Sequence, residues 1–296
     1  MEYTKRKHQK MIAIVGSGKL TNYLLKNIGN KNYLLISGTK KKHPNIVNVD
    51  KNLQNINNIK LSSNITHCII NWSHTYINKF SKFRNSILGF ERISDFIINN
   101  PKVSYIFISS TSASLEVNKY SLYGLSKYIA ENILKKIKEC NPKINIHILR
   151  PGMIYGLQDC PVKKILSFRR FFIEVYPGNP EVDFPVTSAK DLTIYLLNTK
   201  SKIWESPKLV LNFYETMPVN LKYFHKKYNY YNSSKYNLFK IYFDHNSFFI
   251  HFLKLLGSKM DLSLASINRF PKDNDIFSSK NEEGIDIYIK NLFIKN

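Results

Sequence analysis

Glycine is scarce in this chain, and long apolar runs are absent. Eleven of the 296 residues are glycine, about half of the roughly 7% that is usual in proteins. No stretch approaches the about 18 consecutive apolar residues that a membrane-spanning helix needs. A hydrophobic fraction of 43% also excludes a disordered chain. We therefore expect a globular protein in which each glycine is informative about the backbone.

Cysteine is equally rare, and its spacing excludes a disulfide framework. Cys68, Cys140 and Cys160 are far apart and form no paired motif. The basic residues 1–10 are followed by only five apolar residues, 11–15, before the first glycine. That run is too short for the apolar core of a signal peptide. We expect a protein of the reducing cytoplasm.

Acidic residues are few: 21 acidic against 44 basic residues give a formal net charge of +23. Such an excess can indicate nucleic acid, a membrane surface or an anionic small molecule as partner. The lysines are scattered through the whole chain, so we expect no nucleic-acid partner. The stretch 248–257 has the pattern of a basic amphipathic helix. Packing inside the protein explains it better, and we expect no stable membrane insertion.

Short apolar runs alternate with helical periods in the first half of the chain. Helical spacing of apolar residues occurs at 20–28, 87–98 and 123–137. Buried strands separated by helices predict an α/β fold with a doubly wound parallel sheet. The apolar runs are 11–15, 33–37, 45–49, 66–71, 103–109 and 144–150.

The pattern loosens after Gly156, which predicts a domain boundary. Four prolines lie between 161 and 185, and strong alternation returns at 209–213. We expect a basic tail at 1–10, a nucleotide-binding domain at 11–160 and a smaller substrate-binding part at 161–296. Segments near 184–213 are expected to return to the first domain.

A glycine-rich turn follows the first predicted strand. Residues 16–21 read G-x-G-x-x-T and open an amphipathic helix, where backbone N–H groups and the helix dipole can bind a pyrophosphate. A P-loop is excluded because Ala13 and Leu20 stand where that motif needs glycine and Ser/Thr. A simple strand–helix turn remains the alternative. The candidate cofactor-binding residues here are Gly16, Ser17, Gly18, Lys19 and Leu20.

The end of the second strand carries no carboxylate. An acidic residue there would hold the ribose hydroxyls of NAD, but this chain has Ser37, Thr39 and Lys40 followed by two more lysines. Hydroxyls and cations suit a 2′-phosphate, so NADP(H) is favoured and NAD(H) stays open. An ordinary basic loop is the alternative. Asp50 ends the third strand and could bind the adenine amino group or form a turn.

Tyr123 and Lys127 are four residues apart on a predicted helix, and so on one face of it. A neighbouring ammonium would stabilise the phenolate of a tyrosine that takes and returns a proton. A hydroxyl from Thr111, or as second choice Ser110, could hold the reacting substrate oxygen. With 19 tyrosines and many lysines in the chain, this spacing alone also arises by chance.

The order of these motifs resembles the extended short-chain dehydrogenase/reductase family, and within it the NAD(P)-dependent nucleotide-sugar epimerases and dehydratases. The glycine turn, the Ser/Thr cluster at 109–112, Tyr123-x-x-x-Lys127 and the segment 149–156 stand in the family's order. The resemblance spans about residues 11–285. It implies an enzyme with a Rossmann fold, and it leaves a homodimer open. No metal is expected, because the eight histidines show no ligand spacing with a cysteine or carboxylate.

The resemblance also implies site residues. Asn71, Trp72, Ser73 and Pro151 match family positions that contact the cofactor, as Lys127 does. Arg269 matches the family's closing segment and is expected to bind the substrate's pyrophosphate. Basic residues after the sixth strand are further candidates, with a solvated helix as their alternative: Lys163, Lys164, Arg169 and Arg170.

The chain departs from the family in three places. The turn is one residue shorter and ends in Thr21, the stretch from Thr111 to Tyr123 is short, and residues 114–116 read Ser-Leu-Glu where the family commonly has Val-Tyr-Gly. The acidic pair typical of the dehydratases is also missing after Thr111. This favours 4-keto reduction or epimerisation of a nucleotide-linked sugar over dehydration, with a role in surface polysaccharide biosynthesis. The alternative is a sensor or scaffold protein that binds NADP without catalysis.

Overall fold

The computed structural model describes residues 11–29, 33–38, 45–49, 53–72, 80–114, 122–157, 173–177, 181–215, 219–231, 239–243 and 284–294. The basic tail at 1–10 and the stretch 248–257 lie outside these ranges. None of the helices within them is both long enough and apolar enough to cross a bilayer.

A seven-stranded sheet runs in the order β10-β6-β5-β4-β1-β2-β3. The pairings from β3 through β6 are all parallel. The chain begins at β1 and adds strands on both sides of it, which confirms the predicted doubly wound α/β sheet. The strands are β1 (Met11–Val15), β2 (Tyr33–Ser37), β3 (Ile46–Asn48), β4 (Ile65–Ile70), β5 (Ser104–Ile108), β6 (Ile146–Pro151) and β10 (Val210–Phe213).

These strands form because their apolar runs are buried on both faces of the sheet. Ala13, Ile14 and Val15 of β1 are completely buried, as are Ile69 and Ile70 of β4. A parallel sheet covered by helices requires such continuous apolar runs rather than alternation. Each of the six predicted runs became a strand, with ends shifted by at most two residues.

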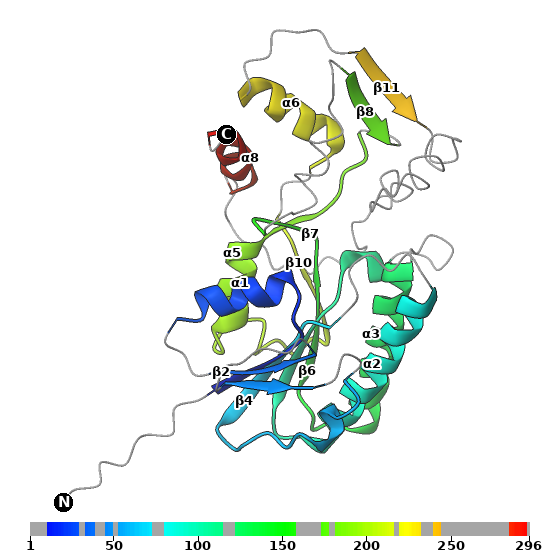
Figure 1. Cartoon of the computed structure of the whole chain (residues 1–296), viewed down its shortest axis with the longest axis vertical. Helices are drawn as coiled ribbons and strands as arrows, with labels where there is room; N and C mark the ends of the chain where they lie inside the picture. The colour runs from blue at the N-terminus through cyan, green and yellow to red at the C-terminus, as the bar shows by residue number, and fades with distance from the viewer. Residues whose placement is uncertain are drawn as a thin grey trace, which may run out of the picture. The chain divides into compact units, whose positions relative to one another are not determined.

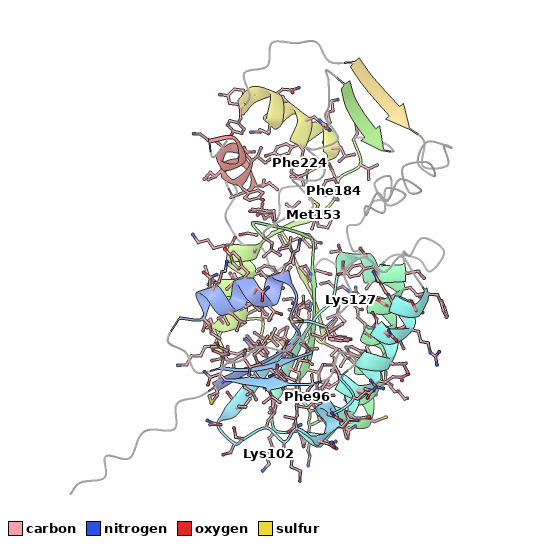
Figure 2. All side chains as sticks on the ribbon, viewed as in Figure 1. Phe96, Lys102, Lys127, Met153, Phe184 and Phe224 are labelled. Carbon is pink, nitrogen blue, oxygen red and sulfur yellow. The ribbon has the colours of Figure 1, made fainter. Side chains whose placement is uncertain are left out.

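Helices cover both faces of the sheet (Figure 1). Helices α2 (Phe80–Asn99) and α3 (Leu122–Cys140) lie on one face, and α1 (Lys19–Asn27) lies on the other. A 3₁₀ turn, η1 (Ile56–Asn58), precedes β4. Side chains spaced by three and four residues along α2 pack into the core beneath it, Phe96 among them (Figure 2).

Contacts between residues divide the chain into two units. The first contains residues 1–109, 125–150 and 193–211, and the second contains 110–124, 151–192 and 212–296. The chain thus changes unit after Arg150, earlier than the expected boundary near residue 160. Residue 160 itself lies outside the described residues.

The second unit has a small core of its own. The first described element of this unit is a 3₁₀ turn, η2 (Thr111–Ser114). The unit also contains two parallel strand pairs: β7 (Met153–Tyr155) with β9 (Val186–Ser188), and β8 (Ile173–Pro177) with β11 (Phe239–Phe243). Helix α5 (Ala189–Leu197) follows β9, and its residues from Thr193 on belong to the first unit. Buried residues of α6 (Leu221–Tyr231) and α8 (Gly284–Ile294) pack together. The rings of Phe184 and Phe224 stack there (Figure 2).

Candidate functional site

The turn after β1 needs glycine at its first position. Gly16 has a φ of +119°, a conformation that side chains rarely adopt. A Cβ atom on Gly16 would also lie 2.2 Å from the carbonyl oxygen of Asn71, the residue after β4. Gly16 therefore lets the ends of β1 and β4 approach each other closely.

The N-terminus of α1 has features of an anion-binding turn. Gly18 is its N-cap in an extended conformation and has no side chain with which to cap the helix, and the first turn contains no acidic residue. Gly18 and Lys19 are exposed, whereas Leu20 is buried beneath the helix. Backbone N–H groups of an exposed glycine turn at a helix N-terminus fit the pyrophosphate of a dinucleotide.

Thr21 replaces the small residue that usually closes this motif, and it has a packing role of its own. Its side chain is completely buried. The side-chain amide of Asn71 donates a 2.9 Å hydrogen bond to the Thr21 hydroxyl. The threonine thus ties α1 to the end of β4, where a glycine would only permit contact.

The candidates after the second and third strands are only partly described. Ser37 ends β2 and is completely buried, and its carbonyl accepts a hydrogen bond from the backbone N–H of Val49. Thr39, Lys40 and Asp50 lie outside the described residues. The preference for NADP(H) therefore stays a prediction.

Trp72 joins the glycine turn to α2 and α3. Its indole lies so close to Gly89 of α2 that a Cβ there would be 2.7 Å from the ring nitrogen. Its carbonyl accepts a hydrogen bond from the Lys127 ammonium at 3.2 Å. Ser73, which follows it, lies outside the described residues.

Lys127 is almost completely buried between α3 and the sheet (Figure 2). Its Nζ donates a 2.6 Å hydrogen bond to the carbonyl of Ile108 and lies 4.6 Å from the centre of the Phe107 ring. Burial lowers the pKa of this amine to about 7, although the nearby Glu131 carboxylate acts in the opposite direction. Lys127 is therefore poised to change its charge near neutral pH.

Tyr123 lies one turn before Lys127 on α3. Burial raises the pKa of its phenol, and a hydrogen bond with the Ser110 hydroxyl partly opposes this. Ser110, the second choice from the sequence, is thus the hydroxyl that contacts Tyr123. Thr111 is buried in η2. Gly124 keeps these elements close, because a Cβ there would lie 3.1 Å from the carbonyl oxygen of Ser112.

Sequence reasoning missed a buried ion pair in the first unit. The completely buried Glu131 accepts hydrogen bonds from Arg150 Nε at 2.9 Å and from a terminal guanidinium nitrogen at 2.6 Å. The Ser109 hydroxyl also donates to it. Two features of the sequence indicated this pair: Glu131 lies four residues after Lys127, and Arg150 ends an apolar strand.

Pro151, a cofactor candidate, follows Arg150 and is buried at the end of β6.

A second buried acidic group lies in the second unit and was also missed. The Tyr155 hydroxyl donates a hydrogen bond to Glu215. Burial raises the pKa of Glu215 to about 7, and the negative charge of Asp191 adds to this. Glu215 thus titrates near neutral pH.

The predicted substrate contacts cannot be placed. Lys163, Lys164, Arg169, Arg170 and Arg269 all lie outside the described residues. Among the residues that the structure does describe, no three His, Cys, Asp or Glu side chains gather as a metal site would require. In the first unit, the described candidates are therefore the glycine turn, Asn71, Trp72 and Lys127.

Comparison with solved structures finds the same fold in enzymes of low sequence identity. UDP-N-acetylglucosamine 4-epimerase from Bacillus cereus is 16% identical, with a TM-score of 0.65 over 97% of this chain and 98% of that one. L-threonine 3-dehydrogenase from Trypanosoma brucei is 10% identical, with a TM-score of 0.65 over 96% of each chain. UDP-glucuronic acid 4-epimerase from Bacillus cereus is 15% identical, with a TM-score of 0.57 over 96% of this chain and all of that one.

No protein-family model matches the chain, and no curated protein matches it in sequence. The structural neighbours confirm the fold class. They include the nucleotide-sugar epimerases that the motif order resembles. At 10–16% identity the likeness concerns the fold.

Proposed function

We propose that this chain is an NAD(P)-dependent enzyme that epimerises, or reduces at a 4-keto group, a sugar linked to a nucleotide. One observation carries the proposal: the glycine turn and Lys127 are joined through the residues at the end of β4. Gly16 approaches Asn71 closely, and Trp72 accepts a hydrogen bond from Lys127. A phosphate-binding turn and a titratable lysine thus converge on one strand end, as a dinucleotide site at the carboxyl edge of a parallel sheet requires.

The residues have distinct roles in this proposal. Gly18 and the first turn of α1 bind the pyrophosphate, and Lys127 binds the nicotinamide ribose. Tyr123 transfers a proton to or from the substrate oxygen, with the Lys127 ammonium stabilising its phenolate. Thr111 or Ser110 orients that oxygen. When bound, the nicotinamide dinucleotide would accept or supply a hydride.

The contacts of Tyr123 and Lys127 support these separate roles. Tyr123 shares a hydrogen bond with a hydroxyl, whereas Lys127 is held by backbone carbonyls at the ends of β4 and β5. These two hydrogen bonds hold the Lys127 ammonium at a defined place, which suits the stabilisation of a neighbouring phenolate.

The substrate and setting follow from the resemblance and the neighbours. The nucleotide-sugar group is supported by two structural neighbours that are named as 4-epimerases of UDP-linked sugars. Arg269 is proposed to bind the nucleotide diphosphate, and we propose a cytoplasmic role in surface polysaccharide biosynthesis. Arg269→Ala should raise the KM by roughly tenfold, as expected for loss of a charge-assisted contact.

The decisive experiment combines binding with turnover. The purified protein is denatured, and any released nucleotide is identified by mass. UDP- and dTDP-linked sugars are then screened with NADP(H) and NAD(H) by nicotinamide absorbance and by chromatography of the sugar products, because an epimerase leaves no net absorbance change. Lys127→Met serves as the matched negative control. Turnover by the wild-type protein and its loss in the variant are expected.

Three other outcomes would redirect the proposal. Cofactor binding without turnover of any nucleotide sugar would favour the non-catalytic NADP-binding protein. Turnover of a small hydroxy or keto compound, in the absence of nucleotide-diphosphate binding, would place the chain closer to its dehydrogenase neighbour. Absence of binding to either dinucleotide would refute the cofactor assignment itself.

A further inference from the structure

Glu131 is the first acidic residue after Lys127 on α3. Both residues are buried in the first unit. The two side chains are four residues apart and so lie on one face of the helix. Glu131 is completely buried and Lys127 is 2% exposed. In so dry a setting a neighbouring charge acts far more strongly than it would at the surface.

The carboxylate of Glu131 is held in place by three hydrogen-bond donors. Arg150 at the end of β6 binds both of its oxygens, and Ser109 at the end of β5 donates to one of them. A bidentate guanidinium contact and a hydroxyl satisfy a buried anion well. Glu131 therefore stays in one position, tied to two strands of the sheet.

The contacts that hold the Lys127 amine include several neutral groups. Two backbone carbonyls and the Phe107 ring contact it. The small cavity beside it is lined by side chains without charge apart from Lys127 itself: Trp72, Ser86, Phe90, Phe107, Ser126 and Ala130. The charged or titratable groups to consider are thus Glu131 and Tyr123 on α3 and Arg150 on β6.

We propose that Glu131 is a positioning residue of this site: anchored by Arg150 and Ser109, its carboxylate shifts the buried Lys127 amine toward its protonated form. The proposal rests on the proposed function for its catalytic meaning, but the charge of Lys127 can be measured without it. When Tyr123 and Lys127 share the loss of one proton, two arrangements compete: phenolate with ammonium, or phenol with neutral amine. An anion behind the lysine favours the first, which is the form that can act as a base.

The opposing influences on Lys127 make this contribution decisive. Burial alone drives the amine toward its neutral form, and the Glu131 charge opposes that tendency, leaving a pKa of about 7. Removal of the anion should leave the amine largely neutral at pH 7. Arg150 carries the opposite charge, so its own effect has to be separated from that of Glu131.

The test measures the titration of Lys127 by NMR in the full chain labelled at lysine Cε and Nζ, and Lys127→Arg identifies its signal. Glu131→Gln should lower the titration midpoint by about one pH unit or more. Glu131→Asp, which keeps the charge, should leave the titration midpoint of Lys127 close to its wild-type value. Glu139→Gln is the matched control: the same substitution on the same helix, at an exposed residue paired with Lys136, should leave it unchanged.

Loss of Glu131 alone removes the carboxylate that pairs with the buried Arg150, which can prevent folding. The double variant Glu131→Gln with Arg150→Met removes that problem, and its Lys127 midpoint should also fall because the Glu131 anion is gone. A midpoint equal to that of the wild-type protein in a folded Glu131→Gln or double variant would overturn the proposal. If the wild-type protein binds no dinucleotide, the proposed function fails while the NMR result still decides the role of Glu131.

Discussion

Replacing Gly18 by alanine should weaken dinucleotide binding while leaving the fold intact. The backbone of Gly18 is extended, with φ −72° and ψ 178°, which alanine adopts freely. A Cβ there would be 3.6 Å from the side-chain nitrogen of Asn71, an ordinary contact. Alanine is a poorer N-cap than glycine by up to about 1 kcal/mol, and its smaller unfolded-state entropy restores about 0.4–1 kcal/mol. The free energy of unfolding should therefore change by less than about 1 kcal/mol.

The same substitution at Gly16 should damage the fold instead. A φ of +119° strains an alanine by about 1–3 kcal/mol. Its Cβ would meet the carbonyl oxygen of Asn71 at 2.2 Å, and pushing the two strand ends apart adds about 1–3 kcal/mol. The loss in the free energy of unfolding should be about 2–6 kcal/mol.

An alanine substitution at Gly29 measures the cost of backbone strain without that of a steric clash. It also has a positive φ, +60°, but no atom of the described residues beyond its chain neighbours lies within 4 Å of where its Cβ would stand. Gly29→Ala should therefore cost about 1–2 kcal/mol through backbone strain alone. The difference between the Gly16 and Gly29 variants measures the close approach of β1 to β4.

Urea titration gives the three free energies of unfolding, and isothermal titration calorimetry with NADP⁺ gives the dissociation constants. For Gly18→Ala we expect wild-type stability with binding weakened at least about tenfold, or 1.4 kcal/mol, because the added methyl group stands where the pyrophosphate would approach. Unchanged NADP⁺ binding by Gly18→Ala would refute the assignment of this turn. A Gly16→Ala protein as stable as Gly29→Ala would refute the packing argument.

Three further predictions concern the remaining groups. Tyr123→Phe should reduce turnover by about 10²-fold or more with near-normal calorimetric cofactor binding, and a near-normal rate would contradict its role as proton carrier. NADP(H) should bind more tightly than NAD(H), and Lys40→Ala should erase the difference; equal affinities in the wild-type protein would count against the 2′-phosphate site. The folded-state pKa of Glu215 is about 7, above the ordinary 4.5. The folded protein therefore loses stability as the pH rises through 7, because the buried carboxyl group must then ionise. Glu215→Gln should accordingly gain stability relative to the wild-type protein between pH 5 and 8, by on the order of 3 kcal/mol, and a flat difference in urea titrations would contradict this.

The strands and the glycine turn could be predicted because their signals are local. A run such as 11–15 is apolar at every position, which only a strand buried on both faces accommodates. Gly16 was recognisable because a turn between strand and helix needs its positive φ. Such features depend on neighbours along the chain, and the sequence displays those neighbours directly.

The partners of the buried polar groups could not be predicted because they depend on the packing of distant segments. The hydrogen bond between Ser110 and Tyr123 is one such contact, because it joins the residue before η2 to the first turn of α3. Glu131 and Arg150 are 19 residues apart and meet only when α3 packs on β6. A glutamate on the inner face of a helix signals that some cation must lie opposite, but only the fold identifies which one.

The contact of Gly124 with η2 has a consequence for engineering. Tyr123 meets Ser110, and the backbone beside Gly124 meets Ser112, although few residues separate these segments in the sequence. The entropy of closing a loop grows slowly, by about 0.6 kcal/mol for each doubling of its length. A longer segment grafted at 115–121 should therefore leave both contacts in place. If Tyr123 acts as proposed, the length of this segment can be varied without rebuilding its surroundings.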